Sequence, residues 1–295
     1  GLVTAALTGG LLYMLWQKAG KWMQGRRVCG GLWGRPAFYW VVLLLGWLPC
    51  FLAYYPAIYS YDGEPQLIQY TQHAFNNHHP LAHTLILGFC YDIGQFFSHK
   101  LHIPLDGMAI YSVLQIFLLS GAFTCGFAFL IRCRASKGML AGTLLWCVLF
   151  PVHPLMAVST TKDTFFTAFF LLDFFLLLSI LEEKDTKRKR WVYFCLANLG
   201  LMLFRKNGVY IQLGLFVICI LITLVCFVRR ARDVSSGLWL RLSAVLLASL
   251  CLFFASDRLL VQVTGAQEGE AAEALSLPLQ QVARIYKSNG DSLQK

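Results

Sequence analysis

Residues 60 to 84, SYDGEPQLIQYTQHAFNNHHPLAHT, place side chains that could do chemistry between two strongly apolar stretches. Two carboxylates, Asp62 and Glu64, stand near the start of this segment. Either could take a proton from a hydroxyl group or contact a divalent cation. Asp62 could equally be the N-cap of a helix that starts at Gly63, with Pro65 in its first turn. We take Asp62 as the first candidate for a general base and Glu64 as the second.

The second half of the segment contributes amides and imidazoles: Asn77, His78 and His79, flanked by His73 and His83. The histidine spacings of four and five residues would suit a metal, but no cysteine or fixed carboxylate completes a zinc pattern. We therefore expect Asn77, His78 and His79 to hydrogen-bond a polar ligand or its phosphate. The alternative is a polar turn closed by Pro80.

Two later motifs carry basic residues beside apolar runs. In STTKDTFF, residues 159 to 166, Lys162 and Asp163 stand at the start of an expected helix, where a cation and the helix N-terminus together suit a phosphate. In LFRKNGVY, residues 203 to 210, Arg205 could grip a phosphate bidentately while Asn207 positions a neighbouring group. For residues 159 to 166, the alternative is a capped helix with a local ion pair. For residues 203 to 210, the alternative is that the basic side chains snorkel to the interface.

The composition requires lipid as part of the solvent. Hydrophobic residues make up 57% of the 295 residues, charged residues 14%, and the mean hydropathy is +0.59. Uncharged runs of about the length that spans a bilayer cover 1–17, 37–54, 138–158 and 209–228, with weaker candidates at 105–131, 164–181, 191–204 and 238–256. The runs do not alternate in polarity as barrel strands do. We predict an all-α bundle with about seven or eight crossings, its first run being a truncated helix and not a signal peptide.

Asp173 lies inside one run, where pairing with a neighbouring helix and proton coupling are the two interpretations.

The placement of charge predicts the topology. Sixteen of the 25 Lys and Arg residues fall in 18–35, 132–137, 182–190 and 229–232, and the positive-inside rule makes these loops cytoplasmic. The net charge of +10 is therefore no sign of nucleic-acid binding, because the basic residues are not gathered on one soluble segment. All polar motifs then lie on the outer face, provided that 83–98 is interfacial or re-entrant and that 105–131 crosses. The ten cysteines lie mostly in apolar runs without a CxxC pair, which indicates packing residues.

Taken in order, these motifs resemble the GT-C class of integral-membrane glycosyltransferases, and more closely an uncharacterised group of bacterial multi-spanning proteins with GT-C-like features. The residues that carry the resemblance are Asp62 and Gln66 in YPAIYSYDGEPQLIQY, His79, Pro80 and Thr84 in NNHHPLAHT, Lys162 and Asp163 in TTKDTFF, Arg205 and Asn207 in FRKNGVY, and Pro278, Gln280, Gln281 and Arg284 in ALSLPLQQVARIY. The resemblance implies a transmembrane domain over 1–256, whose external loop 55–104 has short interfacial helices and carries the site. Residues 257–295 would begin an extracytoplasmic segment that continues beyond this sequence.

The resemblance also implies an activity. Such an enzyme of the cell membrane takes a sugar from a polyprenyl-phosphate-linked donor and transfers it, on the extracytoplasmic side, to an acceptor in a glycan, lipid or protein. Asp62 is then the base or the contact of a divalent cation such as Mg²⁺ or Mn²⁺. The loop has a single Asp followed by Gly and Glu, and not a paired DxD, so the metal question stays open. The rival interpretations are a transporter or flippase of a lipid-linked or anionic substrate, and a scaffold of a cell-envelope complex.

Overall fold

The computed structural model describes residues 30–183, 187–228, 234–267 and 276–293. Within these ranges the regular secondary structure is helical, apart from two isolated bridges that join Ile58 to Ser159 and Asn76 to Gln267. The predicted all-helical fold is confirmed at this level. The apolar run 1–17 lies outside the described residues.

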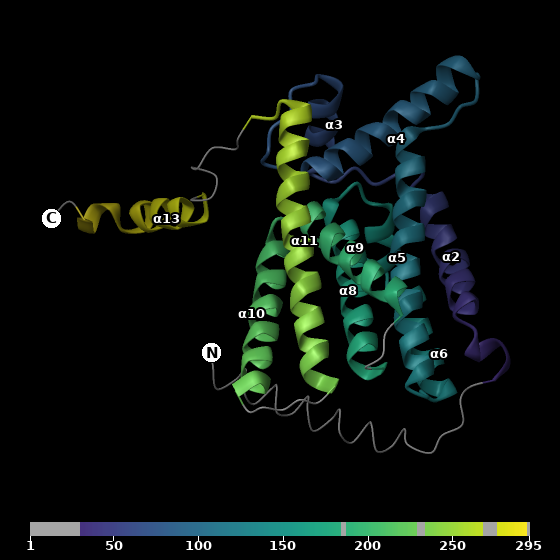
Figure 1. Ribbon diagram of the computed structural model, residues 1–295. Helices are drawn as coiled ribbons and strands as arrows, with labels where there is room; N and C mark the ends of the chain where they lie inside the picture. Colours follow the sequence, from purple (N-terminus) through teal and green to yellow (C-terminus); the bar gives the residue numbers. More distant parts are fainter. Residues whose placement is uncertain (1–29, 184–186, 229–233, 268–275, 294–295) are drawn as a thin grey trace.

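Five helices are long and apolar enough to cross a membrane: α2 (Pro36–Ala53), α5 (Gly107–Arg132), α8 (Lys162–Glu183), α10 (Asn207–Val228) and α11 (Val234–Thr264). At a rise of about 1.5 Å per residue, even the shortest reaches roughly the hydrocarbon thickness. They run side by side in Figure 1. These helices therefore form the body of the protein, and their two ends are called here the upper and lower ends as drawn in Figure 1.

The run 138–158 needs a correction, because it forms two helices and not one. Helix α6 (Lys137–Leu149) and helix α7 (Val152–Val158) are bent by 49° at a short break. The break falls at Phe150 and Pro151, where Phe150 takes an extended backbone. A proline restricts the residue before it to such conformations and cannot donate to the helical ladder. The pair is a broken span or a re-entrant segment.

Helix α9 (Arg188–Phe204) corresponds to the weaker run 191–204 and packs against α8 and α11. With 17 residues it is one residue shorter than α2. By length and composition the described residues thus hold five spans, or six if the bent pair counts as one. The prediction of seven or eight crossings stays a prediction.

Two helices cover the upper end. Helix α3 (Gly63–Thr71) packs on α4 (Leu81–Lys100), and α4 lies obliquely across the ends of the long helices (Figure 1). By length and composition, α4 is not among the described helices able to span a membrane. The interfacial placement of 83–98 stays a prediction. A Cβ atom added to Gly94 would lie 2.3 Å from the backbone nitrogen of Gly107, so glycine is needed where α4 meets the start of α5.

Close side-chain packing holds the long helices together. In the largest cluster, Tyr39 stacks on Phe127 with ring centroids 4.3 Å apart, and the buried Trp47 indole donates a 3.0 Å hydrogen bond to the Cys147 carbonyl. In lipid, helices associate through packing and hydrogen bonds and not through the hydrophobic effect. The nine described cysteines are all free thiols, as expected of packing residues.

One buried carboxylate joins three helices. Asp173 of α8, 5% exposed, accepts hydrogen bonds from Asn198 Nδ2 of α9 at 2.7 Å and from Gln212 Nε2 of α10 at 3.1 Å. Both interacting amides are themselves buried. The interpretation of Asp173 as a partner of neighbouring helices is therefore confirmed.

Replacing Asp173 with Leu should lower the thermal unfolding midpoint of the detergent-solubilised protein. The two amides would lose a buried acceptor, a loss of about 1–2 kcal/mol, whereas Asp173→Asn keeps one acceptor oxygen and should lose less. Thr167→Ala, at an exposed position of the same helix, is the matched control. Equal midpoints for Asp173→Leu and wild type would contradict this role.

Candidate functional site

The site begins with two loop segments that pair with each other at the upper end. Ile58 N donates to Val158 O at 2.8 Å, and Thr160 N donates back to Ile58 O at 2.9 Å. Ser60 N then donates to Thr160 Oγ1 at 2.9 Å. This short two-stranded contact, the 58–160 clamp, fixes the segment before α3 against the segment before α8.

Glycine is required where the clamp meets α3. A Cβ atom on Gly63 would lie 2.2 Å from Thr160 Oγ1 and 2.6 Å from the Thr160 carbonyl oxygen. Because Gly63 follows Asp62 and Thr160 stands two residues before Lys162, this close approach sets the distance between the two charged side chains. The sequence motifs SYDG and STTKD are thus one structural unit.

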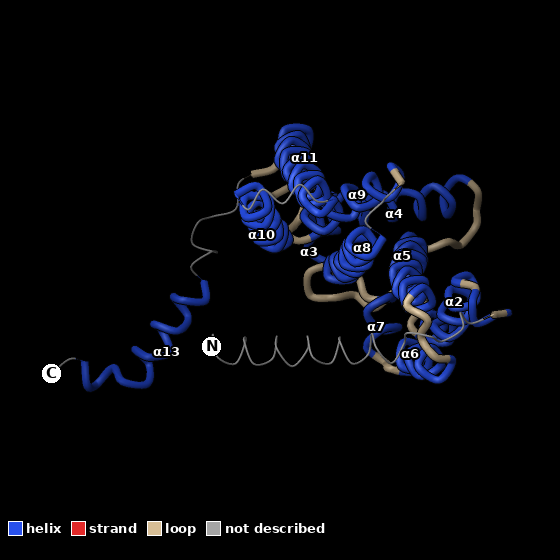
Figure 2. Tube along the Cα trace, turned by 60° about the horizontal axis from the view of Figure 1, so that its bottom comes forward, coloured by secondary structure: helices blue, strands red, loops and turns tan. Residues whose placement is uncertain are grey.

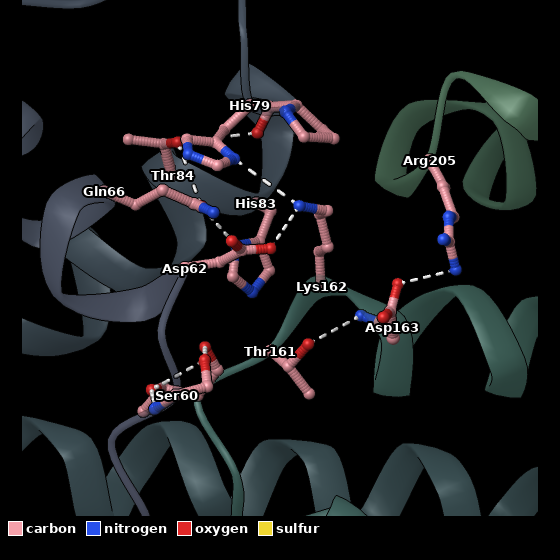
Figure 3. Close-up of polar contacts among 12 residues, drawn as sticks. Ser60, Asp62, Gln66, His79, His83, Thr84, Thr161, Lys162, Asp163 and Arg205 are labelled. Carbon is pink, nitrogen blue, oxygen red and sulfur yellow. Dashed lines mark hydrogen bonds and ion pairs between the residues drawn. The ribbon is translucent and has the colours of Figure 1, made fainter. Parts of the chain in front are cut away.

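Asp62, Lys162 and His79 meet at this unit (Figure 3). The Lys162 ammonium forms an ion pair with Asp62 Oδ2 and lies 3.4 Å from His79 Nδ1. An ammonium can only donate, so Nδ1 is the unprotonated ring nitrogen in this contact. The Lys162 and Asp62 side chains are 17% and 31% exposed, which leaves them open to a ligand without full desolvation.

The electrostatics favour the ionised carboxylate. Partial burial of Asp62 opposes ionisation, but the hydrogen bond and charge of Lys162 hold the pKa of Asp62 below its usual value. As long as Lys162 stays in contact, Asp62 is a weak base. Its basicity would rise if the ammonium moved to another anion.

A second ion pair lies next to the first. Asp163 Oδ1 lies 2.9 Å from Arg205 Nη1 at the end of α9, and the Arg205 guanidinium stands 5.5 Å from the centroid of the Phe166 ring. Both side chains are about two-fifths exposed, so the pair contributes little to stability. Two adjacent residues of α8 thus take part in two ion pairs (Figure 3). Lys162 is the cation of the first pair, with Asp62 before α3, and Asp163 binds the cation of the second pair, Arg205 at the end of α9.

A buried hydrogen-bond chain supports α3 and α4 from beneath. His83 Nδ1 donates to Gln66 Oε1 at 2.5 Å, and Tyr111 donates its hydroxyl proton to His83 Nε2 at 2.6 Å. Gln115 Nε2 donates to the Tyr111 hydroxyl at 3.0 Å and to the Thr161 carbonyl at 3.1 Å. The chain thus runs from the residue before Lys162, through α5, to the helix that follows Asp62.

Burial keeps His83 neutral. Loss of hydration on burial, followed by the nearby charge of Lys162, lowers the pKa of His83 to about 3. A neutral ring is what the chain needs, because Gln66 Oε1 requires a donor and the Tyr111 hydroxyl an acceptor. The sequence contains only a weak signal for this support, because Tyr111 and Gln115 are four residues apart on one helix.

Glu64 is separated from Asp62 by the turn of α3. It is exposed and lines a different cleft, of about 570 Å³, together with Tyr59, Leu67 and Tyr91. Residues two positions apart lie about 200° apart around a helix. The expectation that Glu64 shares the role of Asp62 is therefore not supported by its position.

The polar loop after α3 is braced by the ends of other helices. Lys206 Nζ donates to the Asn77 carbonyl, Asn77 N donates to Gln267 O at 2.9 Å, and Gln267 N donates to Phe75 O at 3.0 Å. His78 is exposed beside His79, with ring centroids 4.5 Å apart. The backbone of Asn77 thus supports the loop, and His79 is the residue of this run that reaches Lys162.

The remaining predicted residues do not converge on this unit. Asn207 is exposed at the first position of α10. Gln281 and Arg284 are exposed on α13 (Ser276–Leu293), which lies apart from the other helices in Figures 1 and 2. Their role in binding a substrate stays a prediction.

The residues present do not fit a divalent cation. Among the described residues, no three His, Cys, Asp or Glu side chains come together as metal ligands, so His73, His78, His79 and His83 do not form a zinc site. The one carboxylate at the centre, Asp62, already has an ammonium on Oδ2. A hard cation prefers several oxygen ligands, and this arrangement offers a competing positive charge instead.

Together these features define an all-helical protein with several membrane-length helices and a charged site at one end of the bundle. The chain belongs to a family of unknown function (DUF6020), whose model matches residues 67–295. The match includes His79, Lys162 and Arg205 and begins just after Asp62. No curated protein and no solved structure matches the chain significantly.

Gly63→Ala should destabilise the protein and displace Asp62 from Lys162. The added methyl group would meet backbone as well as side-chain atoms of Thr160, and such overpacking typically costs about 1–3 kcal/mol. A lower thermal midpoint would report the loss. Gly142→Ala is the control, because a Cβ atom there has no neighbour within 4 Å and alanine favours the helix. Equal midpoints for the two variants would argue against the close contact.

His83 should make the protein less stable in mild acid. Its folded pKa of about 3 lies below the unfolded value, so the unfolded chain binds the extra proton first as the pH falls below about 6.5. The stability that neutral His83 contributes is present above that pH and is lost toward pH 3. Thermal midpoints from pH 7.5 to 4.5 should therefore fall more steeply for wild type than for His83→Gln, which keeps one donor and one acceptor. Parallel curves would contradict the assignment.

Proposed function

We propose that this protein is a membrane glycosyltransferase, which moves a sugar from a polyprenyl-phosphate-linked donor to a hydroxyl group of an extracytoplasmic acceptor. The observation that carries the proposal is the contact of Lys162 with both Asp62 and His79, at the end of a bundle of membrane-length helices. A carboxylate that can accept a proton and a cation that can bind a phosphate are both needed for this reaction.

The reaction assigns a role to each charged group. Asp62 takes the proton of the acceptor hydroxyl, whose oxygen attacks the anomeric carbon of the sugar. The bond between that carbon and the phosphate oxygen breaks, and its electron pair leaves with the lipid phosphate. Lys162 and Arg205 stabilise the charge that grows on this leaving group, a contribution that preorganised cations make most strongly in a site sheltered from water.

The ion pair explains how Asp62 becomes a base only when the donor is bound. In the unliganded arrangement the Lys162 ammonium contacts Asp62 and depresses its pKa. A donor phosphate would draw the ammonium away, and the Asp62 carboxylate would then regain its usual affinity for a proton. Donor binding and base activation are coupled in this way, which limits proton transfer to the loaded enzyme.

The positions of the polar groups favour transfer over transport. A flippase needs polar groups along the depth of the membrane. Asp173, an acidic side chain deep in the described bundle, accepts hydrogen bonds from Asn198 and Gln212 and helps to join three helices. The groups open to a ligand, Asp62, Lys162 and Arg205, lie together at the upper end (Figure 3).

The test uses the full-length protein reconstituted with polyprenyl-phosphate sugars and candidate acceptors. Asp62→Asn should lower turnover by about 10²- to 10⁴-fold, the usual contribution of general base catalysis. Donor binding should not weaken, because Lys162 no longer has to leave the Asp62 carboxylate. Glu64→Gln should keep most of the activity, because Glu64 lines a different cleft. Equal turnover in Asp62→Asn and wild type would remove Asp62 from the mechanism. Movement of the lipid-linked sugar across the bilayer without transfer would favour the flippase.

A further inference from the structure

A cleft at the lower end of the bundle, away from the site described above, combines basic and apolar walls. It has a volume of about 430 Å³ and lies where the start of α2 meets α5, α8 and α9. Arg132 and Arg190 stand in its wall with Ser179, while Ala128, Phe175 and Leu176 contribute apolar surface. A cleft with two such walls suits an amphipathic ligand.

The two arginines meet at one buried residue. A guanidinium N–H of Arg132 donates to Ser179 Oγ, and Arg190 Nη1 lies 3.4 Å from the Ser179 carbonyl oxygen that accepts from it. Ser179 is 3% exposed, and its hydroxyl donates to the Phe175 carbonyl at 2.7 Å. Side chains of α5 and α9 are thereby held together on α8. Each guanidinium has five N–H donors in a planar fork, which matches the oxygens of a phosphate.

The basic wall of the cleft lies nearer the ends of the helices than the apolar wall does. Arg132 is the last residue of α5, and Arg190 is the third residue of α9, so both cations lie at the ends of their helices. Ala128 stands one helical turn further into the bundle, and Phe175 one turn before Ser179 on α8. In a bilayer crossed by α5 and α8, the basic wall would lie at the level of the headgroups and the apolar wall toward the hydrocarbon.

We propose that this cleft binds an anionic phospholipid, with its phosphate on Arg132 and Arg190 and the upper part of an acyl chain along Ala128, Phe175 and Leu176. Basic clefts between membrane helices on the cytoplasmic side are typical sites for anionic lipid headgroups. At the lower end, the described residues 132–137 and 187–190 belong to loops that the positive-inside rule assigns to that side. The apolar wall distinguishes a lipid from a soluble anion, which would use the arginines alone. The inference does not depend on the glycosyltransferase proposal.

The test measures lipid binding by the purified full chain in detergent. Phosphatidylglycerol should raise the thermal midpoint and remain bound in native mass spectra, whereas phosphatidylcholine, which has no net charge, should do neither to the same extent. The double variant Arg132→Gln, Arg190→Gln should lose at least about tenfold in phosphatidylglycerol affinity, as expected when two charge-assisted contacts are removed. Lys137→Gln, a basic residue at the same end that does not line the cleft, is the matched control and should bind as wild type does.

A second variant keeps the proposal testable if the double variant fails to fold. Ala128→Phe leaves both arginines in place and fills the apolar wall, so it should weaken phosphatidylglycerol binding while the protein stays folded. Equal phosphatidylglycerol binding by Ala128→Phe and wild type would overturn the proposed acyl-chain path. A midpoint shift of the same size with millimolar inorganic phosphate would identify a simple anion site and overturn the lipid assignment. Equal binding of phosphatidylglycerol and phosphatidylcholine would also overturn the assignment of an anionic lipid.

Discussion

The charged site depends on the 58–160 clamp, the backbone contact between residues 58–60 and 158–160. Two loops that are distant in the sequence are joined there by backbone hydrogen bonds, and Gly63 allows the chain to pass Thr160 at close range. Asp62 and Lys162 extend from opposite sides of this contact and meet above it. A flexible pair of surface charges would gain little from meeting, but a pair placed by backbone geometry is preorganised.

Beneath the clamp, a hydrogen-bond chain of neutral side chains supports α3 and α4 without placing a charge in the buried interior. Gln66, His83, Tyr111 and Gln115 are fully buried, and each hydrogen bond in the chain has one donor and one acceptor. Buried charges would need full pairing, whereas a neutral imidazole needs only its two neighbours. The charges are thereby confined to the partly exposed level of Lys162 and Asp62, where a ligand can reach them.

Much of the fold was predictable because lipid imposes simple length and polarity rules. The runs 37–54 and 209–228 match α2 and α10 within two residues at each end. The run 138–158 is not one continuous helix, because hydropathy does not reveal the effect of Pro151 on the helical backbone. The grouping of Asp62, His79 and Lys162 at one end followed from counting Lys and Arg. Composition does not report side-chain direction or packing. It therefore could not show that Glu64 lies away from Asp62, that His83 is buried, or that Arg284 lies away from the charged site.

The polar loop that carries His79 depends on contacts with residues that come much later in the sequence. The loop that carries His79 accepts a hydrogen bond from Lys206 and pairs with Gln267, which follows α11. During synthesis, α2 to α9 can enter the membrane and pack before these partners exist. The hydrogen bonds of Phe75 and Asn77 with Gln267 can form only after the chain has been synthesised beyond α11. A chain shortened before α11 would keep the residues of the clamp yet lack the Gln267 contacts that support the loop of His79.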